Sequence, residues 1–202
     1  MGLQTVSIIS SSKEKERFVK YLLNDIKALE FMIEKDMIEK GIKRIGAEQE
    51  LCLVDATWRP APIIHEILPK INNKLFTTEL AKFNLEINLD PIEFKADCLS
   101  KLESNLLKNI ENAEKVLKKE DAKVILTGIL PTIRNKDLHI SNMTSLDRYH
   151  ALSNSLSKLR GGKFEFHISG TDELITALDT VMFESCNTSF QLHYQVSSDE
   201  FV

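Results

Sequence analysis

The sequence lacks any apolar run long enough to cross a membrane. A membrane-spanning helix needs about 20 consecutive apolar residues, and every apolar stretch here is much shorter. The N-terminus, MGLQTVSIISSSKEKER, holds only a brief apolar patch before charged residues begin, and no signal peptide is evident. We therefore expect a soluble cytoplasmic protein that does not act at a membrane.

Cysteine is scarce, and basic residues are not in excess. The three cysteines (Cys52, Cys98 and Cys186) are odd in number, far apart and free of any CxxC motif. This argues against a disulfide framework or a zinc site and agrees with a reducing cytosol. The 26 Lys and Arg residues face 30 Asp and Glu residues, whereas a nucleic-acid-binding surface needs a clear basic excess. A mildly acidic protein can still bind ATP, because a bound metal ion supplies positive charge locally.

The 202 residues, 43% of them hydrophobic, suit one globular domain or a piece of a larger one. The sequence contains no internal repeat, low-complexity tract or linker. Apolar residues recur at three- and four-residue steps from residue 12 to about residue 40, which predicts an amphipathic helix. We expect residues 1–41 to form a helical segment packed on a domain that residues 42–202 form.

Beyond residue 41, segments with strand and helix patterns are mixed without a regular βαβ rhythm. Thr144 and Asp147 resemble a capping box at the start of one helix, and Pro91 is expected to end a strand. The mixture favours the α+β class with a largely antiparallel sheet. Strands are predicted at 42–55, 83–91, 123–131, 163–169 and 189–196, and helices within 57–74 and at 99–119, 144–159 and 172–184.

Two of these strands carry carboxylates on one face. Glu48 and Glu50 are two residues apart, so their side chains project from the same face of the strand. Glu86 lies between Asn84 and Asn88 on one face of its own strand. The opposite faces of both strands are apolar and suit a core.

A third strand places Gln191, His193 and Gln195 on one face. If the three strands are neighbours, their oxygen donors converge, and an oxygen-rich site without sulfur favours Mg²⁺ or Mn²⁺ over zinc. The same alternation is typical of any antiparallel sheet with one face in water. Two details favour the metal site: glutamate is a poor strand former, and the Glu-bearing faces offer no Lys, Arg or Thr.

Four segments together resemble the glutamate–cysteine ligases, in particular the carboxylate–amine ligase branch called family 2. That family pairs a G-x-E-x-E strand with a second Glu-bearing strand that runs into a proline, and a further carboxylate lies seven residues before that Glu. The resemblance spans about residues 45–196, and Gln191 matches a later T-x-x-Q pattern. The four segments are GAEQELCLVD, TTELAKFNLEINLDP, NMTSLDRYHALSNSL and TSFQLHYQV.

The resemblance implies a fold like glutamine synthetase, with a curved, mainly antiparallel sheet and helices on one face. It implies that Mg²⁺ or Mn²⁺ ions on the concave face bridge ATP and the substrate carboxylate. It also implies His193 as a group on the nucleotide side, and it assigns no catalytic residue. The metal ligands it implies are Glu48, Glu50, Glu79, Glu86 and Gln191.

The implied reaction transfers the γ-phosphoryl group of ATP to the side-chain carboxylate of glutamate. An amine, which is cysteine's in the namesake enzymes of glutathione biosynthesis, then attacks the acyl phosphate and forms a γ-glutamyl amide. The expected partners are small molecules, namely ATP, glutamate and an amino acid or amine, and a homo-oligomer is compatible with them. The sequence does not identify the amine.

The family's members are longer than 202 residues, and further metal and substrate-binding residues lie in their later part. We therefore expect this chain to be the N-terminal part of such a domain, truncated at its C-terminal end and inactive alone. An alternative is a non-catalytic module of the same fold that senses nucleotide or metal or acts as a scaffold. A third interpretation is a related small-molecule kinase.

Overall fold

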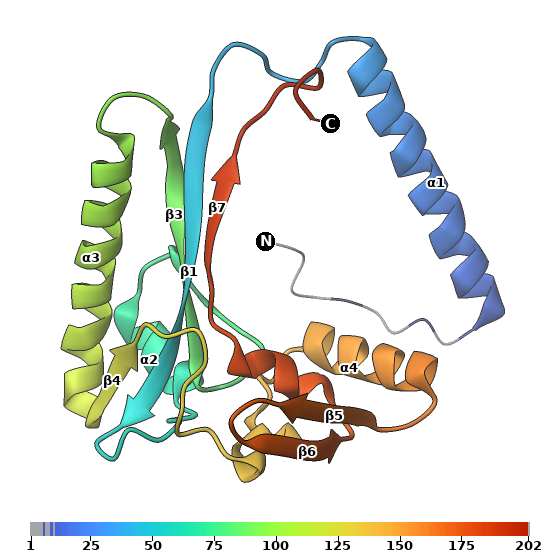
Figure 1. Cartoon of the computed structure of the whole chain (residues 1–202). Coiled ribbons are helices and arrows are strands. Elements are labelled where there is room, and N and C mark those ends of the chain that lie inside the picture. The colour runs from blue at the N-terminus through green and yellow to red at the C-terminus, as the bar shows by residue number, and fades with distance from the viewer. Residues whose placement is uncertain (1–5, 7–8, 10, 202) are drawn as a thin grey trace.

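The structure is a computed structural model, and it describes residue 6, residue 9 and residues 11–201 of the chain (Figure 1). Its main element is a five-stranded antiparallel sheet with helices on one face, beside a two-stranded hairpin. This mixture confirms the predicted α+β class. The helices are α1 (Ser12–Glu34), α2 (Ile64–Ile71), α3 (Cys98–Leu117) and α4 (Asp147–Arg160). The strands are β1 (Arg44–Asp55), β2 (Phe76–Thr78), β3 (Asn84–Glu93), β4 (Ala122–Ile125), β5 (Phe164–Ser169), β6 (Glu173–Leu178) and β7 (Phe190–Tyr194). Short 3-10 helices are η1 (Lys118–Glu120), η2 (Asn135–Leu138), η3 (Ile140–Asn142) and η4 (Val181–Cys186).

Strand β1 is the centre of the main sheet because it pairs along both of its edges. One edge pairs with β3 over most of its length, and β3 in turn pairs with β2. The other edge is divided: β7 pairs with residues 45–49, and β4 pairs with residues 52–55. The two Glu-bearing strands and the strand of Gln191 are therefore direct neighbours, as the predicted convergence of their polar side chains requires.

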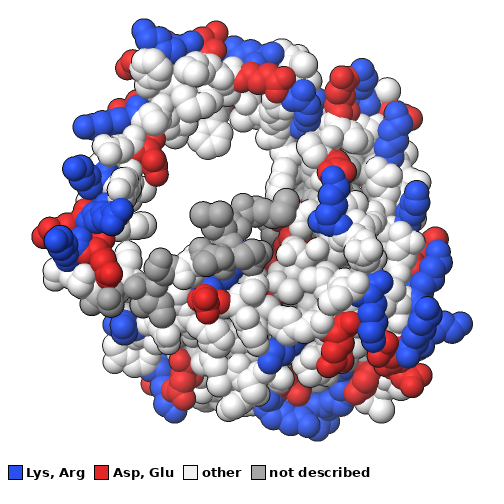
Figure 2. Space-filling view, turned by 180° about the vertical axis from the view of Figure 1, so that it is seen from behind, with Lys and Arg blue, Asp and Glu red and all other residues white. Residues whose placement is uncertain are grey.

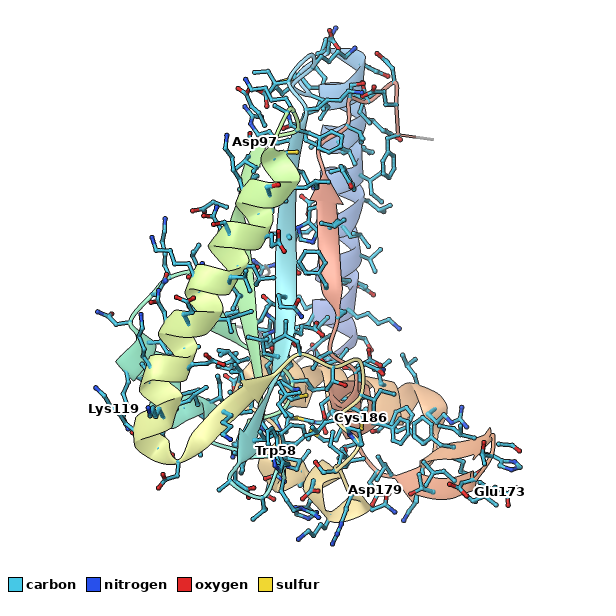
Figure 3. The ribbon with its side chains drawn as sticks, turned by 60° about the vertical axis from the view of Figure 1, so that its left-hand side comes forward. Trp58, Asp97, Lys119, Glu173, Asp179 and Cys186 are labelled. Atoms are coloured by element: carbon cyan, nitrogen blue, oxygen red, sulfur yellow. The ribbon has the colours of Figure 1, made fainter. Side chains whose placement is uncertain are left out.

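Helix α3 closes one face of this sheet. Its buried residues recur at three- and four-residue steps, as expected for a helix with one apolar face. They pack on the apolar side chains of β1 and β3, which alternate with the polar ones. Figure 3 shows α3 along the sheet, with Asp97 at its beginning and Lys119 just beyond its end. Because α3 covers the apolar face, the opposite face carries the polar side chains.

A second apolar cluster supports the loops at one end of the sheet. Phe83, Met143 and Met182 come from three distant segments, and each is at most 1% exposed. The backbone N–H of Thr144 also donates to the carbonyl of Leu80 at 2.9 Å. These contacts hold the turn between β2 and β3 against the segment before α4.

Helix α1 stands apart from the sheet. It begins with a capping box in which the Ser11 hydroxyl accepts from the backbone N–H of Glu14 at 3.2 Å. All of its 23 residues are exposed, and Figure 2 shows an opening between this helix and the rest of the molecule. The expectation that residues 1–41 pack on the domain therefore gains no support here, and this division of the chain stays a prediction.

The predicted length of this first helix was wrong. The helix ends at Glu34 rather than near residue 40, because Asp36 adopts a left-handed backbone conformation with φ of 55°. No helix among the residues described here combines the length and the apolar character that a lipid bilayer demands of a spanning segment.

One predicted helix is a strand. We expected a helix over residues 172–184, but this segment contains β6, paired with β5, and then η4. The backbone N–H of Gly170 donates to the carbonyl of Asp172 at 2.9 Å and closes the turn of the hairpin. Ile175 and Thr176 are β-branched and suit a strand with cross-strand neighbours. The conformation of this segment is therefore set by its pairing with β5 and not by the helical pattern in its sequence.

Strand β3 continues past Pro91, where we expected it to end. The register between β1 and β3 shifts between Ile45 and Ala47, so that β3 carries an extra residue at this point. Proline lacks a backbone donor, and a bulge is a place where a strand tolerates it. The strand consequently pairs on to Glu93, opposite Arg44.

Candidate metal centre

The polar face of the sheet is the face that carries Glu48, Glu50, Glu86 and Asn88. In the ladder between β1 and β3, Glu50 lies opposite Glu86 and Glu48 lies opposite Asn88. On the other edge of β1, Gln191 of β7 lies opposite Glu48. Residues opposite each other in antiparallel strands project to the same side, about 5 Å apart. The predicted arrangement of these side chains on one face is therefore confirmed.

Glu79 comes from the turn between β2 and β3 and not from a strand. The hydroxyl of Thr144 donates to the backbone carbonyl of Glu79, and this contact ties the turn to the segment before α4. The predicted capping box of Thr144 and Asp147 was wrong, because α4 has Leu146 as its N-cap residue and no side-chain cap. The Thr144 hydroxyl instead helps to place a site residue.

Three carboxylates meet on the polar face, and we call Glu50, Glu79 and Glu86 the carboxylate triad. One oxygen of each lies within 4.8 Å of the others. Ligands of an octahedral Mg²⁺, bound at about 2.1 Å, lie about 3 to 4.2 Å apart. The side chain of Asn88 donates to Glu86, and the backbone N–H of Ser189 donates to Glu50 Oε2 at 2.8 Å. The triad is thus held close to a spacing that suits a metal ion.

The electrostatics of the triad are unfavourable without a cation. Burial, together with the adjacent carboxyl groups of Glu86 and Glu50, raises the pKa of Glu79 from 4.5 to about 8. Burial and the nearby charge of Glu79 likewise raise the pKa of Tyr149 to about 12. Glu86 is only 8% exposed, whereas Glu50 and Glu79 are partly exposed, so water screens the repulsion between these groups only in part.

The donor set of the triad fits a divalent metal ion. Within the described part of the chain, no Lys or Arg forms an ion pair with Glu50, Glu79 or Glu86. Three carboxylates without a basic partner are an all-oxygen set, which Mg²⁺, Mn²⁺ and Ca²⁺ prefer. These residues could therefore hold such an ion, whose charge would replace the missing basic partner.

Glu48, Gln191 and His193 lie beside the triad but outside the group of three. The carboxylate of Glu48 is 3.7 Å from Nε2 of His193. Gln191 Nε2 donates to the Ser189 hydroxyl at 3.1 Å, so its carboxamide oxygen points elsewhere and remains a candidate ligand. Gln191 also lines the same cavity as Glu50. The five predicted metal ligands are therefore neighbours, and oxygens of three of them, Glu50, Glu79 and Glu86, lie within 4.8 Å of one another.

A larger cavity lies farther along the polar face, on the side of Glu48. It has a volume of about 820 Å³, which is within the range of small-molecule sites. His193, Asn88, Lys74 and Arg44 line it as well. Arg44 is engaged by Glu39 at 2.6 Å, but Lys74 is exposed and has no ion pair among the residues described. The lining of this cavity therefore combines carboxylates with a basic side chain that has no ion pair among the described residues.

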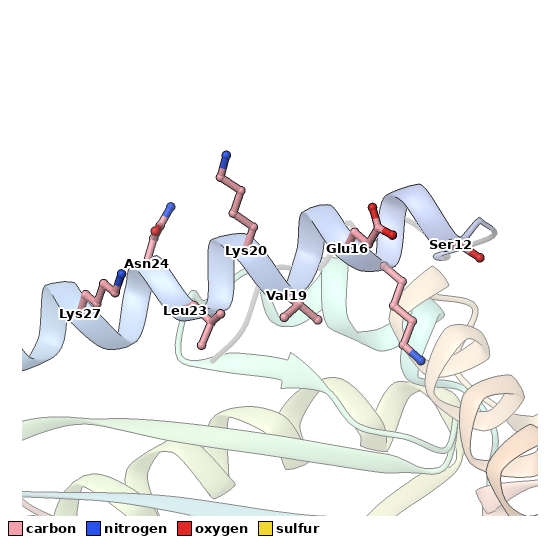
Figure 4. Close-up of a pocket in the computed structure, with 8 residues that line it drawn as sticks. Ser12, Glu16, Val19, Lys20, Leu23, Asn24 and Lys27 are labelled. Carbon is pink, nitrogen blue, oxygen red and sulfur yellow. The ribbon is translucent and has the colours of Figure 1, made fainter.

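A hollow of about 680 Å³ also lies along α1 (Figure 4). All of its lining residues belong to this one helix, and among residues 11–201 no other element lines the hollow opposite Val19 and Leu23. A ligand site is normally concave and encloses most of the ligand. We therefore place the functional site on the sheet and not on α1.

Three polar residues near the triad were not predicted as site residues. Asn84 lines the cavity beside Glu50, and its position two residues before Glu86 was a signal for the shared face. Glu184 lines the same cavity but fell in a segment predicted as a helix, so its direction could not be inferred. Ser189 acts through its backbone N–H, and no sequence pattern indicates such a contact.

Comparison with known proteins gives one match. A family model described as glutamate-cysteine ligase family 2 matches residues 44–201 of the chain, which covers β1 through the segment after β7. No curated protein and no solved structure matches the chain. The match includes every residue of the carboxylate triad and both Gln191 and His193.

Proposed function

Because the chain belongs to glutamate–cysteine ligase family 2, a family of carboxylate–amine ligases, we propose that it serves ATP- and Mg²⁺-dependent formation of a γ-glutamyl amide. Mn²⁺ is an equivalent ion in this proposal. The substrates are ATP, glutamate and an amine, and the reaction proceeds through an acyl phosphate on the side-chain carboxylate of glutamate.

The observation that carries this proposal is the carboxylate triad. Glu50, Glu79 and Glu86 bring oxygens within 4.8 Å of one another, and no basic side chain among the described residues pairs with them. Clustering three carboxylates in this way is unfavourable by itself. The arrangement is explained if a cation occupies it during function.

The residues divide between metal and nucleotide. Glu50, Glu79 and Glu86 would hold the ion. Glu48 and the carboxamide oxygen of Gln191 would be further ligands. A bound divalent cation would neutralise phosphate oxygens and align the γ-phosphoryl group with the acceptor carboxylate. The protein's own part is to position these ligands, because phosphoryl transfer requires little covalent chemistry from side chains.

The cavity on the Glu48 side is our candidate for the nucleotide. Its volume of about 820 Å³ suits a ligand of that size. Lys74 is placed to neutralise phosphate charge. His193, 3.7 Å from Glu48, would contact the nucleotide where it approaches the metal ligands. The phosphates would then run from this cavity toward the triad.

Metal-dependent stability tests the proposal directly. We expect millimolar Mg²⁺ or Mn²⁺ to raise the melting temperature of the EDTA-treated chain by about 5–10 °C, if the ion is present at about 100 times its Kd. Glu50→Ala and Glu86→Ala should each abolish this rise. Glu103→Ala, at an exposed position of α3, is the matched control and should leave it unchanged.

Turnover is tested separately, by ADP release from the whole natural protein that contains this chain, with glutamate and a panel of amines. An equal melting temperature with and without metal would overturn the metal site. A metal-dependent rise without any ADP release would favour the alternative of a module that senses nucleotide or metal. Release of ADP without an amine requirement would instead favour a kinase.

A further inference from the structure

Helix α1 carries a row of apolar side chains that are half exposed to water. Phe18, Leu22, Ile26, Leu29 and Ile33 follow one another at steps of three and four residues, so they share one face of the helix. We call these five residues the α1 stripe. Each of them is between 46% and 53% exposed, and no residue of α1 is buried. Helices in proteins owe most of their stability to the packing of such a face against another element, so the α1 stripe calls for a partner.

The chain fixes α1 at its C-terminal end. The carboxylate of Glu39, shortly after the helix, pairs with Arg44 of β1 at 2.6 Å and accepts from the Gln195 side chain at 2.7 Å. Lys40 pairs with Asp199 at 2.9 Å. Figure 1 shows α1 leading away from this attachment, and Figure 2 shows the opening beside it. The helix is therefore a projecting element that a second molecule can reach.

The charges of α1 are divided along its length. The half from residue 12 to residue 23 holds four basic and two acidic residues, whereas the half from residue 24 to residue 34 holds three acidic residues and one basic residue. The helix as a whole is neutral. An amphipathic helix that lies on a membrane is instead rich in Lys and Arg on its polar face. The charges of α1 therefore favour a protein partner over an anionic lipid surface.

This division of charge is complementary to itself in one orientation. Two copies of α1 that run in opposite directions place the basic half of each against the acidic half of the other. A parallel pair would place like charges side by side, which is unfavourable. The antiparallel pair also sets the two helix dipoles in opposite directions. A second copy of α1 therefore matches both the apolar stripe and the charges.

The apolar area of the helix is sufficient for such a pair. Val19, Tyr21 and Met32 widen the stripe and are between 37% and 54% exposed. A half-exposed large side chain offers roughly 80–100 Å², so these eight residues together offer roughly 700 Å² per chain. Two copies would bury at most about twice this area, and specific interfaces start at about 1,200 Å² in total. We therefore expect a dimer with a Kd in the micromolar range.

We propose that α1 is a dimerisation helix, which packs its stripe antiparallel against the α1 stripe of a second copy of this chain. The apolar side chains form the seam, and the charges of opposite halves flank it. A two-fold axis passes near Ile26, at the middle of the stripe. The carboxylate triad lies on the sheet and takes no part in this interface, so the inference does not depend on the proposed function.

Sedimentation equilibrium of the chain in EDTA, from low to high micromolar concentration, tests the association. We expect a reversible equilibrium between monomer and dimer. Ile26→Glu should weaken it at least tenfold, because a charge then enters the apolar seam. Asn24→Glu adds the same charge at an exposed position on the side of the helix away from Val19 and Leu23 (Figure 4) and should leave the equilibrium unchanged. Ile26 is not buried in the single chain, so its replacement removes no core contact.

Crosslinking tests the orientation. Phe18 and Ile33 lie at opposite ends of the stripe, and the three natural cysteines are buried. Phe18→Cys and Ile33→Cys are treated with a short bismaleimide, each alone and in an equal mixture, with the unsubstituted chain as the control. An antiparallel pair brings position 18 of one copy beside position 33 of the other. We therefore expect crosslinked dimers in the mixture and few in either variant alone.

A monomer at every concentration would overturn the proposal, and it would include the case in which the stripe docks on its own chain. An association that Ile26→Glu leaves unchanged would place the interface elsewhere and has the same meaning. Crosslinking of Phe18→Cys alone that equals crosslinking of the mixture would refute the antiparallel orientation. Because the measurements are made in EDTA, their outcome is independent of metal binding at the triad.

Discussion

Replacing Glu79 with glutamine tests how much the carboxylate triad destabilises the metal-free chain and how much it contributes to stabilisation by a metal ion. In the folded chain the pKa of Glu79 is raised to about 8, first by burial and then by Glu86 and Glu50. In the unfolded chain the same group ionises near 4.5. Between these two pH values the folded state keeps a proton that the unfolded state has released. The contribution of Glu79 to the free energy of unfolding without metal is therefore highest below pH 4.5 and falls as the pH rises toward 8.

The size of this loss follows from the two pKa values. Each pKa unit corresponds to about 1.4 kcal/mol, so a rise from 4.5 to about 8 has an upper limit of about 5 kcal/mol. Glu79 is only partly buried, and solvent and salt screen part of the interaction. We therefore expect the metal-free chain to lose about 2 kcal/mol over this pH range, and Glu79→Gln to lack that loss because glutamine does not ionise.

The assay is urea unfolding in EDTA at pH 5, 6, 7 and 8, followed by the same series in millimolar Mg²⁺. With metal, the natural chain should be stabilised more at pH 8 than at pH 6, because the ion competes with the proton for Glu79. Glu79→Gln should show a flatter metal-free profile and a weaker response to Mg²⁺. Glu103→Gln makes the same substitution at an exposed position of α3 and should follow the natural chain.

Identical pH profiles for the natural chain and Glu79→Gln would refute this reasoning. Such a result would mean that the three carboxylates do not repel one another in solution. The triad would then be part of an ordinary solvent-exposed face of an antiparallel sheet, and the repulsion between its carboxylates would no longer support a bound cation.

Three further predictions concern the parts of the fold around the site. Thr144→Val should lower the free energy of unfolding by about 1–2 kcal/mol in denaturant titrations, because it leaves the Glu79 carbonyl without its hydroxyl donor; an unchanged midpoint would contradict this role. Leu117→Ala, at a fully buried position of α3, should cost about 2–5 kcal/mol, whereas Leu99→Ala, on the same helix but 60% exposed, should cost well under half of that. Burial raises the pKa of the Cys186 thiol to about 11, and all three cysteines are buried, so thiol reagents at pH 8 should label the folded chain far more slowly than the urea-unfolded one; equal rates would mean that these thiols are open to solvent.

The sequence predicted the faces of the strands well because the signal is local. Side chains alternate with a period of two, so the common face of Glu48 and Glu50 follows from their spacing alone. The convergence of the polar side chains required β1, β3 and β7 to be neighbours, a condition that the alternation alone could not establish and that the register of the sheet meets. Glu79 lies in a turn, where no period applies, and only the family resemblance pointed to it.

The features that were missed depend on contacts between distant segments. The strand β6 forms because β5 lies beside it, and Glu184 lines its cavity from η4, which follows that hairpin. The cavity that Glu50 and Glu184 line exists because η4 and the segment after it return to the sheet beside Asn84. The role of Thr144 was misread for the same reason, since its partner Glu79 is 65 positions away in the sequence.

The divided edge of β1 has a consequence for the order in which the chain folds. The carboxylate triad comes from one continuous part of the sequence, between β1 and β3, whereas the bond from Ser189 to Glu50 spans 139 positions. Closing a longer loop costs more entropy and slows folding. The capacity to hold a metal ion can therefore arise once the β1–β3 ladder has formed, and the pairing of β7 with β1 would later bring Gln191 to the site. In a refolding experiment, metal uptake would precede the pairing of β7 with β1.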